Sequence, residues 1–243
     1  VLGAILKQTG RISESLVASQ KSLQLAPQDA EAHNNLGNAL QANGDVEKAI
    51  NSFQQAIKLR PDYAVAYNNI GVAFSNMGLF EAAIDNYEQA IKLQPDYAEV
   101  HFNIGNSFNE KGRLEAAMRS YINVLTIQPD FSAAYYNLGH VLQDVQFSKP
   151  IKNLQEVIVQ LLDKKIYVRP YQIGSALVSL ISLDKSLQTL LDSSPRGCFA
   201  ENLEQIISQL SKIPLLLRMM EIFPIPDPKI EVLLTRLRSE ILF

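Results

Sequence analysis

The chain has 243 residues and a formal net charge of −3, with 47% apolar and 19% charged residues. Nucleic-acid-binding domains ordinarily carry a basic surface, so the acidic balance argues against a nucleic-acid partner. No apolar run reaches the roughly 18 residues that span a bilayer, which argues against a membrane partner. The single cysteine, Cys198, excludes an internal disulfide and is typical of a reducing compartment, so we expect a cytoplasmic protein.

The sequence repeats with a period of 34 residues. The motif Asn-Asn-Leu-Gly at 34–37 returns in related form, and its second asparagine is found at Asn35, Asn69, Asn103 and Asn137. Prolines keep the same period, at Pro27, Pro61, Pro95 and Pro129. A fixed period of this length predicts an architecture of stacked units, each of which buries its apolar face against its neighbours.

One unit, residues 30–61, predicts two helices joined by a turn. Apolar residues at helical spacing predict a first helix near 30–43, and Gly44 then stands where a left-handed turn can end it. A second helix is expected near 46–59, before Pro61. Asp62 is a candidate N-cap for the next helix, as are its counterparts Asp96 and Asp130. By the same pattern, first helices are expected near 64–77 and 98–111, and second helices near 80–93 and 114–127.

The repeat resembles the tetratricopeptide repeat (TPR) family. The match rests on first-helix glycines (Gly37, Gly71, Gly105, Gly139), on turn glycines (Gly44, Gly78, Gly112), on a small residue early in the second helix (Ala49, Ala83, Ala117) and on the aromatic behind it (Phe53, Tyr87, Tyr121). The resemblance implies an all-α fold, namely a right-handed TPR superhelix, or α-α solenoid.

The pattern divides the chain into a partial repeat at 1–29, full repeats at 30–63, 64–97 and 98–131, and a degenerate repeat at 132–164. In the last of these, Gln146 replaces the turn glycine and Pro150 interrupts the start of the second helix. Residues 165–243 lack the period and predict a helical C-terminal cap or subdomain. Its helices are expected near 170–182, 184–193 and 200–211, after Pro214, and at 228–242.

The C-terminal stretch that begins at Pro214 resembles the helical segment before the catalytic domain of bacterial TPR-containing methyltransferases. In addition, the chain begins at Val1, without methionine and within a repeat. We therefore expect a fragment of a longer protein. Under that reading, a catalytic part would follow Phe243.

The candidate site is the row formed by Asn35, Asn69, Asn103 and Asn137, called here the asparagine ladder. In the TPR family the first helix of each repeat lines a concave groove, and the ladder resembles that of the TPR superhelix of O-linked N-acetylglucosamine transferase. An asparagine amide both donates and accepts, so it can pair with the backbone of an extended or disordered polypeptide. Further candidates for peptide binding are Asn34, Asn38, Asn68, Asn76, Asn106, Asn109 and His140.

Three alternatives remain open from the sequence. The asparagines could brace neighbouring helices instead of binding a peptide. The chain could be the substrate-recruiting, non-catalytic arm of a glycosyl- or methyltransferase. It could also form a homodimer through its apolar termini, Val1–Leu6 and Ile241–Phe243.

No catalytic motif, phosphate loop or metal-ligand spacing is present in the sequence, so we expect neither enzymatic activity of this chain nor a cofactor or metal. His33 and His101 share a repeat position with Tyr67 and Tyr135, which favours a packing role for both histidines. The groove positions lack Lys and Arg, which argues against a clamp for a C-terminal carboxylate.

Overall fold

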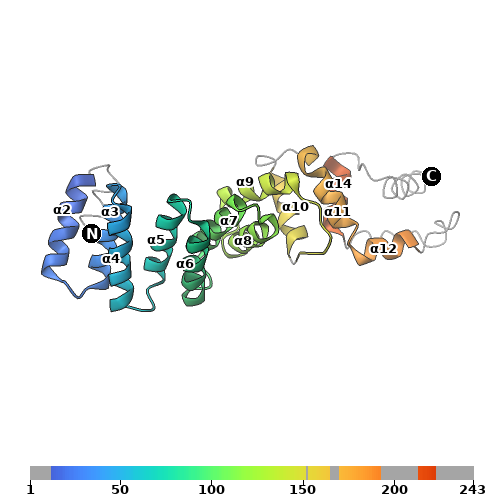
Figure 1. Cartoon of the computed structure of the whole chain (residues 1–243). Helices are drawn as coiled ribbons and strands as arrows, with labels where there is room; N and C mark the ends of the chain where they lie inside the picture. Colours follow the sequence, from blue (N-terminus) through green and yellow to red (C-terminus); the bar gives the residue numbers. More distant parts are fainter. Residues whose placement is uncertain (1–11, 152, 165–169, 193–212, 223–243) are drawn as a thin grey trace. The chain divides into compact units, whose positions relative to one another are not determined.

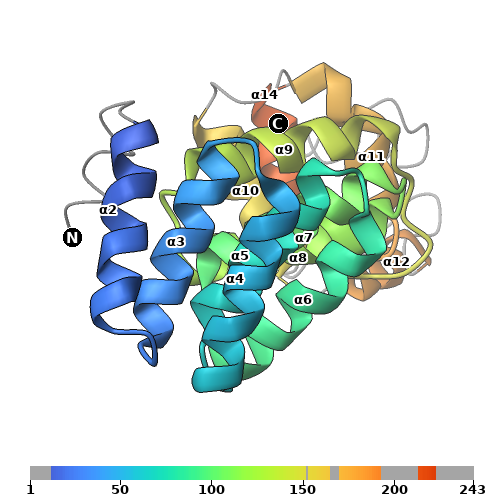
Figure 2. The same cartoon turned by 60° about the vertical axis from the view of Figure 1, so that its left-hand side comes forward.

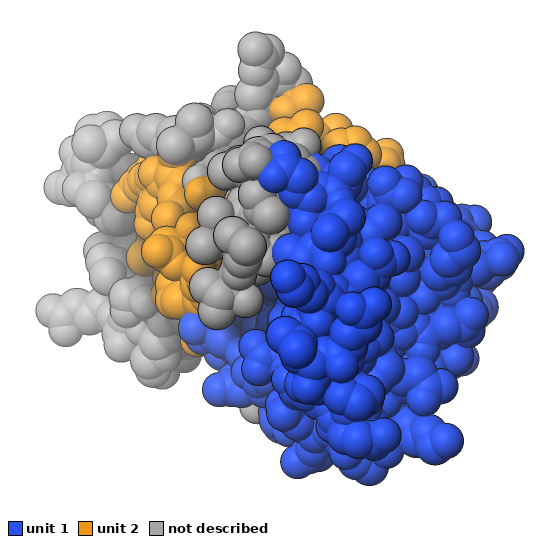
Figure 3. Space-filling model, turned by 90° about the vertical axis from the view of Figure 1, so that its left-hand side faces the viewer, with its two compact units in different colours: residues 1–127 blue, residues 128–243 orange. Residues whose placement is uncertain are grey.

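The computed structural model describes residues 12–151, 153–164, 170–192 and 213–222, and every regular element among them is a helix (Figure 1). The fold is therefore an all-α solenoid, as the period predicts. The helices expected near 200–211 and 228–242, and Cys198, lie outside the described residues. By their internal contacts the residues form two compact units, unit 1 at 1–127 and unit 2 at 128–243 (Figure 3).

Unit 1 contains the helices of the three full repeats. The first helix of each, called here an A helix, is α3 (Ala30–Ala42), α5 (Ala64–Asn76) or α7 (Ala98–Glu110). The second, a B helix, is α4 (Val46–Leu59), α6 (Phe80–Leu93) or α8 (Leu114–Ile127). The partial repeat contributes α2 (Ile12–Leu25), which packs on α3. The predicted ends of the six repeat helices are confirmed to within one residue.

Each A helix packs against its own B helix, and α4 and α6 also pack against the A helix that follows each of them, α5 and α7 (Figure 2). The A and B helices of a repeat approach closely because a glycine faces an aromatic ring. A Cβ atom added at Gly37 would lie 2.5 Å from the Phe53 ring, and one at Gly71 would lie 2.5 Å from the Tyr87 ring. The residues that carry the family resemblance are thus the ones that set the helix spacing.

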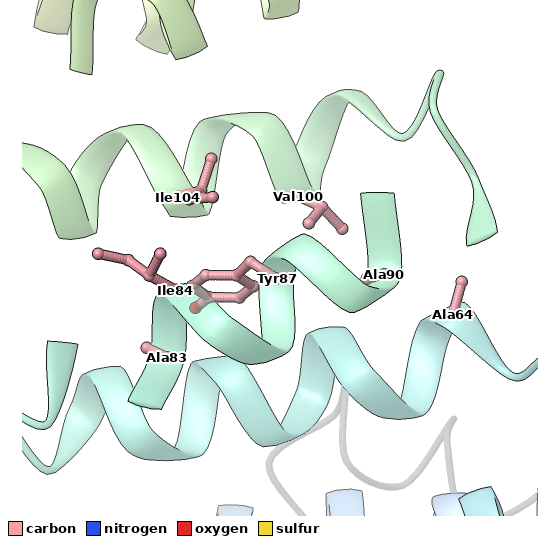
Figure 4. Close-up of a cluster of buried hydrophobic side chains, with 7 residues drawn as sticks. All are labelled: Ala64, Ala83, Ile84, Tyr87, Ala90, Val100 and Ile104. Carbon is pink, nitrogen blue, oxygen red and sulfur yellow. The ribbon is translucent and has the colours of Figure 1, made fainter. Parts of the chain in front are cut away.

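The core between two repeats is seen in Figure 4, where Tyr87 lies among aliphatic side chains from α5, α6 and α7. Tyr87 is 1% exposed, and Ala83 and Ala90 on its own helix are fully buried. Val100 and Ile104 of α7 reach the cluster from the next repeat. Because the cluster draws on consecutive repeats, neither repeat buries its apolar surface without its neighbour.

The turn between the A and B helices of a repeat depends on glycine. Gly44, Gly78 and Gly112 have φ angles of +90°, +73° and +67°, the left-handed region predicted for them. The predicted caps are wrong at α5 and α7, since the N-cap residues there are Tyr63 and Tyr97, which make no side-chain cap bond. Each helix begins one residue later than an Asp62 or Asp96 cap requires.

Unit 2 begins with α9 (Ser132–Val141), which continues as the short 3₁₀ helix η1 (Leu142–Asp144). It then contains α10 (Leu154–Lys164), η2 (Pro170–Ile173), α11 (Gly174–Ile181), α12 (Lys185–Asp192) and α14 (Pro214–Ile222). The Tyr135 hydroxyl donates to Oε1 of Gln160 at 2.9 Å and so ties α9 to α10. Arg218 of α14 lies 2.8 Å from Asp163 of α10, measured from Nε to Oδ1.

Candidate functional site

The candidate site lies on the exposed side of the A helices of unit 1. Helix α3 contacts α5, and α5 contacts α7. The A helices therefore form a continuous surface. Positions four, seven and eleven residues apart share one face of a helix. This stripe is called here the A-helix face, and it consists of Glu31, Asn35, Asn38 and Ala42 on α3, Val65, Asn69, Val72 and Asn76 on α5, and Glu99, Asn103, Asn106 and Glu110 on α7.

None of these twelve residues is buried; Glu31, Asn76, Glu99 and Glu110 are exposed and the rest are half-buried. Three ladder residues, Asn35, Asn69 and Asn103, occupy the same row on successive helices. The period of the sequence thus becomes a row of amides across unit 1, at the accessible position that the hypothesis of peptide binding requires.

The asparagines also bond to one another across repeats. Nδ2 of Asn69 donates to Oδ1 of Asn34 at 2.8 Å, and Nδ2 of Asn103 donates to Oδ1 of Asn68 at 3.1 Å. Asn34 and Asn68 are only 4% and 2% exposed. They do not fit the predicted peptide contact, because a ligand cannot reach an amide that is buried against the next helix. Their place is behind the ladder, where they brace it.

The two neighbouring asparagines of the motif therefore differ in burial, since Asn34 and Asn68 are buried whereas Asn35 and Asn69 are half-buried. One step along a helix turns a side chain by about 100°, so the first asparagine faces the adjacent repeat and the second faces outward. The cross-repeat bond uses one N–H of Asn69 and of Asn103. Each amide has a second N–H and an oxygen with two lone pairs.

The other predicted residues of unit 1 divide in a similar way. Asn38, Asn76 and Asn106 lie on the A-helix face, and Asn106 also accepts a hydrogen bond from the Tyr121 hydroxyl at 2.9 Å. Asn109 is half-buried and falls outside the four rows of the face. The face therefore combines the ladder with amides that have a second, internal contact.

Asn137 and His140 take the equivalent register on α9, which belongs to unit 2. Asn137 is half-buried and His140 is exposed. These two residues therefore belong to unit 2, whereas the A-helix face belongs to unit 1. Tyr136, which directly precedes Asn137 on α9, is 60% exposed.

The packing role predicted for His33 and His101 is confirmed. Nε2 of His33 lies 3.1 Å from the carbonyl oxygen of Pro27, and Nε2 of His101 lies 2.8 Å from that of Pro95. A carbonyl oxygen only accepts, so each ring donates its Nε2–H to the proline that ends the previous repeat. Each histidine therefore ties its A helix to the turn that precedes it.

Charge on the A helices has one sign. Helices α3, α5 and α7 contain Glu31, Glu99 and Glu110 and no Asp, Lys or Arg. Within the described ranges, no group of three or more His, Cys, Asp and Glu side chains is placed to hold a metal ion. Nor does any described helix combine the length and apolarity that crossing a membrane requires. The chemistry that the face offers is hydrogen bonding by amides beside negative charge.

Comparison with protein families agrees with this architecture. A family model described as "Tetratricopeptide repeat" matches residues 28–96, and one described as "TPR repeat" matches 3–44 and 105–146. The chain belongs to the tetratricopeptide repeat family. A comparison with curated protein sequences finds no match.

Solved structures of TPR proteins share the fold. A crystal structure of MamA is 22% identical, with a TM-score of 0.54 over 75% of this chain and 96% of that chain. MamA 41-end from Desulfovibrio magneticus RS-1 is 17% identical, with a TM-score of 0.53 over 76% and 92%. YrrB, described as a TPR protein with an unusual peptide-binding site, is 21% identical, with a TM-score of 0.50 over 69% and 83%. At these identities the likeness concerns the fold alone.

Proposed function

We propose that the A-helix face is a binding site for an extended polypeptide and that the chain is a protein-protein interaction module. The single observation that carries the proposal is the row of Asn35, Asn69 and Asn103, accessible and at equal repeat spacing. An extended peptide presents its own N–H and C=O groups at a regular spacing, and amides can pair with both. The peptide-binding site named for YrrB, a protein of the same fold, supports the same assignment.

The cross-repeat bonds favour binding because they hold the ladder side chains in place. Ordering a free side chain at an interface costs about 0.5–1.5 kcal/mol. Asn69 and Asn103 have met much of that cost in the folded chain, since Asn34 and Asn68 fix the planes of their amides. The oxygen and second N–H of each amide would then need little further ordering to bind a peptide backbone.

The strength of binding follows from the number of contacts. Three ladder amides that each make two backbone hydrogen bonds, at about 1 kcal/mol each, amount to roughly 6 kcal/mol. Because ordering the peptide takes up part of this energy, the dissociation constant from these contacts is tens of micromolar or weaker. We therefore expect weak, reversible binding that depends on the backbone of the peptide more than on the identity of its side chains.

The test uses a random library of 12-residue peptides, displayed on phage and selected against the full chain. The affinity of a selected peptide is then compared between wild type and Asn69→Ala/Asn103→Ala. We expect a loss of tenfold or more in that variant. Methylation of alternate backbone nitrogens of the peptide should cause a similar loss. It removes the N–H groups that would donate hydrogen bonds to the amide oxygens of the ladder.

Asn34 and Asn68, the buried partners of the ladder, supply a matched control. Asn34→Ala/Asn68→Ala removes the same two cross-repeat hydrogen bonds and leaves the ladder amides in place. Both double variants should lower the free energy of unfolding by a similar amount, about 1–2 kcal/mol per lost bond. The ladder variant should lose clearly more peptide affinity than the Asn34→Ala/Asn68→Ala variant, because the latter keeps the ladder amides and loses only their ordering. Equal losses in both would assign the asparagines to stability alone.

The reading of the chain as the recruiting arm of a larger glycosyl- or methyltransferase stays a prediction. It depends on the stretch from Pro214 onward, of which only 214–222 is described. It is compatible with peptide binding by unit 1, because such an arm would bind its substrate in the same way.

A further inference from the structure

The A-helix face is negative, and its negative charges have no partners on the A helices. Glu31 and Glu99 lie in its first row and Glu110 in its last, and all three are exposed. The B helices, by contrast, carry charges of both signs, the cations being Lys48, Lys58, Lys92 and Arg119. What distinguishes the A helices is that they lack Lys and Arg, so their glutamates have no cation on the same helix.

The ion pairs of unit 1 do not neutralise this face. Among the described residues, the ion pairs of unit 1 engage Asp45, Glu81 and Glu115, which lie at turns or on B helices. Glu31, Glu99 and Glu110 take part in none of these pairs. Burial raises the pKa of the Tyr97 hydroxyl, and the negative charge of nearby Glu99 raises it further. Burial and then Glu31 raise the pKa of the Tyr63 hydroxyl, whereas Arg60, whose guanidinium carbon lies 4.7 Å from the centre of the Tyr63 ring, lowers it.

The position of the glutamates beside the ladder favours a cationic peptide over an acidic one. On α7 the stripe reads Glu99, Asn103, Asn106, Glu110, so a carboxylate stands on either side of the amides. A peptide whose backbone lies on the ladder therefore passes between the two carboxylates. A long cationic side chain can extend along the helix from the peptide backbone to the carboxylate of Glu99 or of Glu110. An acidic peptide is repelled by both carboxylates.

We propose that the A-helix face binds basic polypeptide segments, in which lysine or arginine side chains pair with Glu31, Glu99 and Glu110 while the backbone pairs with the ladder. The inference rests on the proposed function, because it assumes that the ladder binds a peptide backbone. It adds the class of partner, namely a cationic and extended chain. The half-buried Val65 and Val72 of the central helix are uncharged, so they suit uncharged peptide side chains between the basic ones.

The test uses three labelled 12-residue peptides built from Ser, Thr and Ala, which carry four lysines, no charge or four glutamates. Binding of each to the full chain is measured by fluorescence anisotropy at 50 mM and 300 mM NaCl. Three exposed ion pairs correspond to roughly tenfold in affinity, so the lysine peptide should bind about tenfold more tightly than the neutral one at low salt. The difference should shrink at high salt, while binding of the neutral peptide stays constant.

A pair of variants with the same change in net charge isolates the face. Glu99→Gln/Glu110→Gln should reduce the affinity for the lysine peptide about fivefold and leave the neutral peptide unaffected. Glu47→Gln/Glu88→Gln, at exposed positions of α4 and α6, should affect neither peptide. An equal loss in both variants would overturn the proposal, because it would assign the preference to net charge and not to this face.

The outcomes separate this inference from the proposed function. If lysine and neutral peptides bind equally well and both depend on Asn69 and Asn103, the preference for basic segments is wrong and the peptide site stands. If no peptide of any charge binds, or if binding ignores the ladder variant, both proposals fail together.

Discussion

At the scale of single residues, the closest contact in each repeat is between a glycine and an aromatic ring. Gly37, Gly71 and Gly105 each leave the space that a ring from the B helix fills, with 2.5–2.7 Å between an added Cβ and the nearest ring atom. Real Cβ atoms do not approach a ring carbon so closely. A methyl group at these positions must therefore displace the helix or the ring.

Gly71→Ala should lower the free energy of unfolding by about 1–3 kcal/mol, because it overpacks the contact with Tyr87. The sign is diagnostic, since alanine in a helix is ordinarily more stable than glycine by about 0.5–1 kcal/mol. Urea denaturation of wild type and variant measures the change. A rise in the denaturation midpoint would contradict a close contact between Gly71 and the Tyr87 ring.

Two controls belong to this variant. In a Tyr87→Leu background the penalty of Gly71→Ala should shrink, because the ring that the methyl group meets is absent. Gly78→Ala meets no atom within 4 Å, but its φ of +73° lies in the left-handed region. It should cost about 1 kcal/mol through backbone strain, with no dependence on Tyr87.

At the scale of elements, repeats are joined by polar contacts as well as by the core. Glu81, at the start of α6, lies 2.9 Å from Nζ of Lys111 and 2.7 Å from Nη2 of Arg113, both in the turn between α7 and α8. A hydrogen bond from Lys111, helped by the charges of both cations, holds the pKa of the Glu81 carboxyl below its ordinary value of 4.5. The contact links the second repeat to the third at the solvent-exposed edge of unit 1.

The Glu81 contact should contribute to stability in a pH-dependent way. A carboxyl whose pKa is lower in the folded state stabilises the fold above its unfolded pKa, and this contribution disappears as the pH falls through the folded value. Wild type should therefore be slightly more stable than Glu81→Gln at pH 7, and the difference should vanish in acid well below pH 4.5. Thermal melts of both proteins from pH 7 to pH 3 measure it. A difference that persists at pH 3 would point to packing instead of charge.

At the scale of the whole molecule, the ladder residues of the A-helix face lie within unit 1, residues 1–127, whereas Asn137 and His140 lie in unit 2. In a repeat protein each repeat is stabilised by contacts with its direct neighbours, so we expect unit 1 to fold without unit 2. The site and its charge should therefore be contained in the first unit.

A fragment of residues 1–127 should fold by itself and bind the lysine peptide within about threefold of the full chain. Circular dichroism should report a helical spectrum and a cooperative melt, and anisotropy should report the affinity. A folded fragment that loses binding more than tenfold would mean that α9, with Asn137 and His140, is part of the site. A fragment that does not fold would show that unit 1 needs the remaining residues for its stability.

Sequence alone determined the six helices of the three full repeats, because the 34-residue period places the apolar, glycine and proline positions at the same point of each unit. The same logic located the row of asparagines and the packing of His33 and His101. It failed at the caps Asp62 and Asp96, where the helix begins one residue later than local cap preferences suggest.

Only the tertiary structure decided what each asparagine of the pair does. Asn34 and Asn69 are 35 residues apart in the chain, and no local pattern states that their amides meet. Stacking of one repeat on the next turns the first asparagine of each pair toward its neighbour and leaves the second accessible. The physical reason is that burial depends on the next repeat, whereas the period of the chain describes only what one repeat contains.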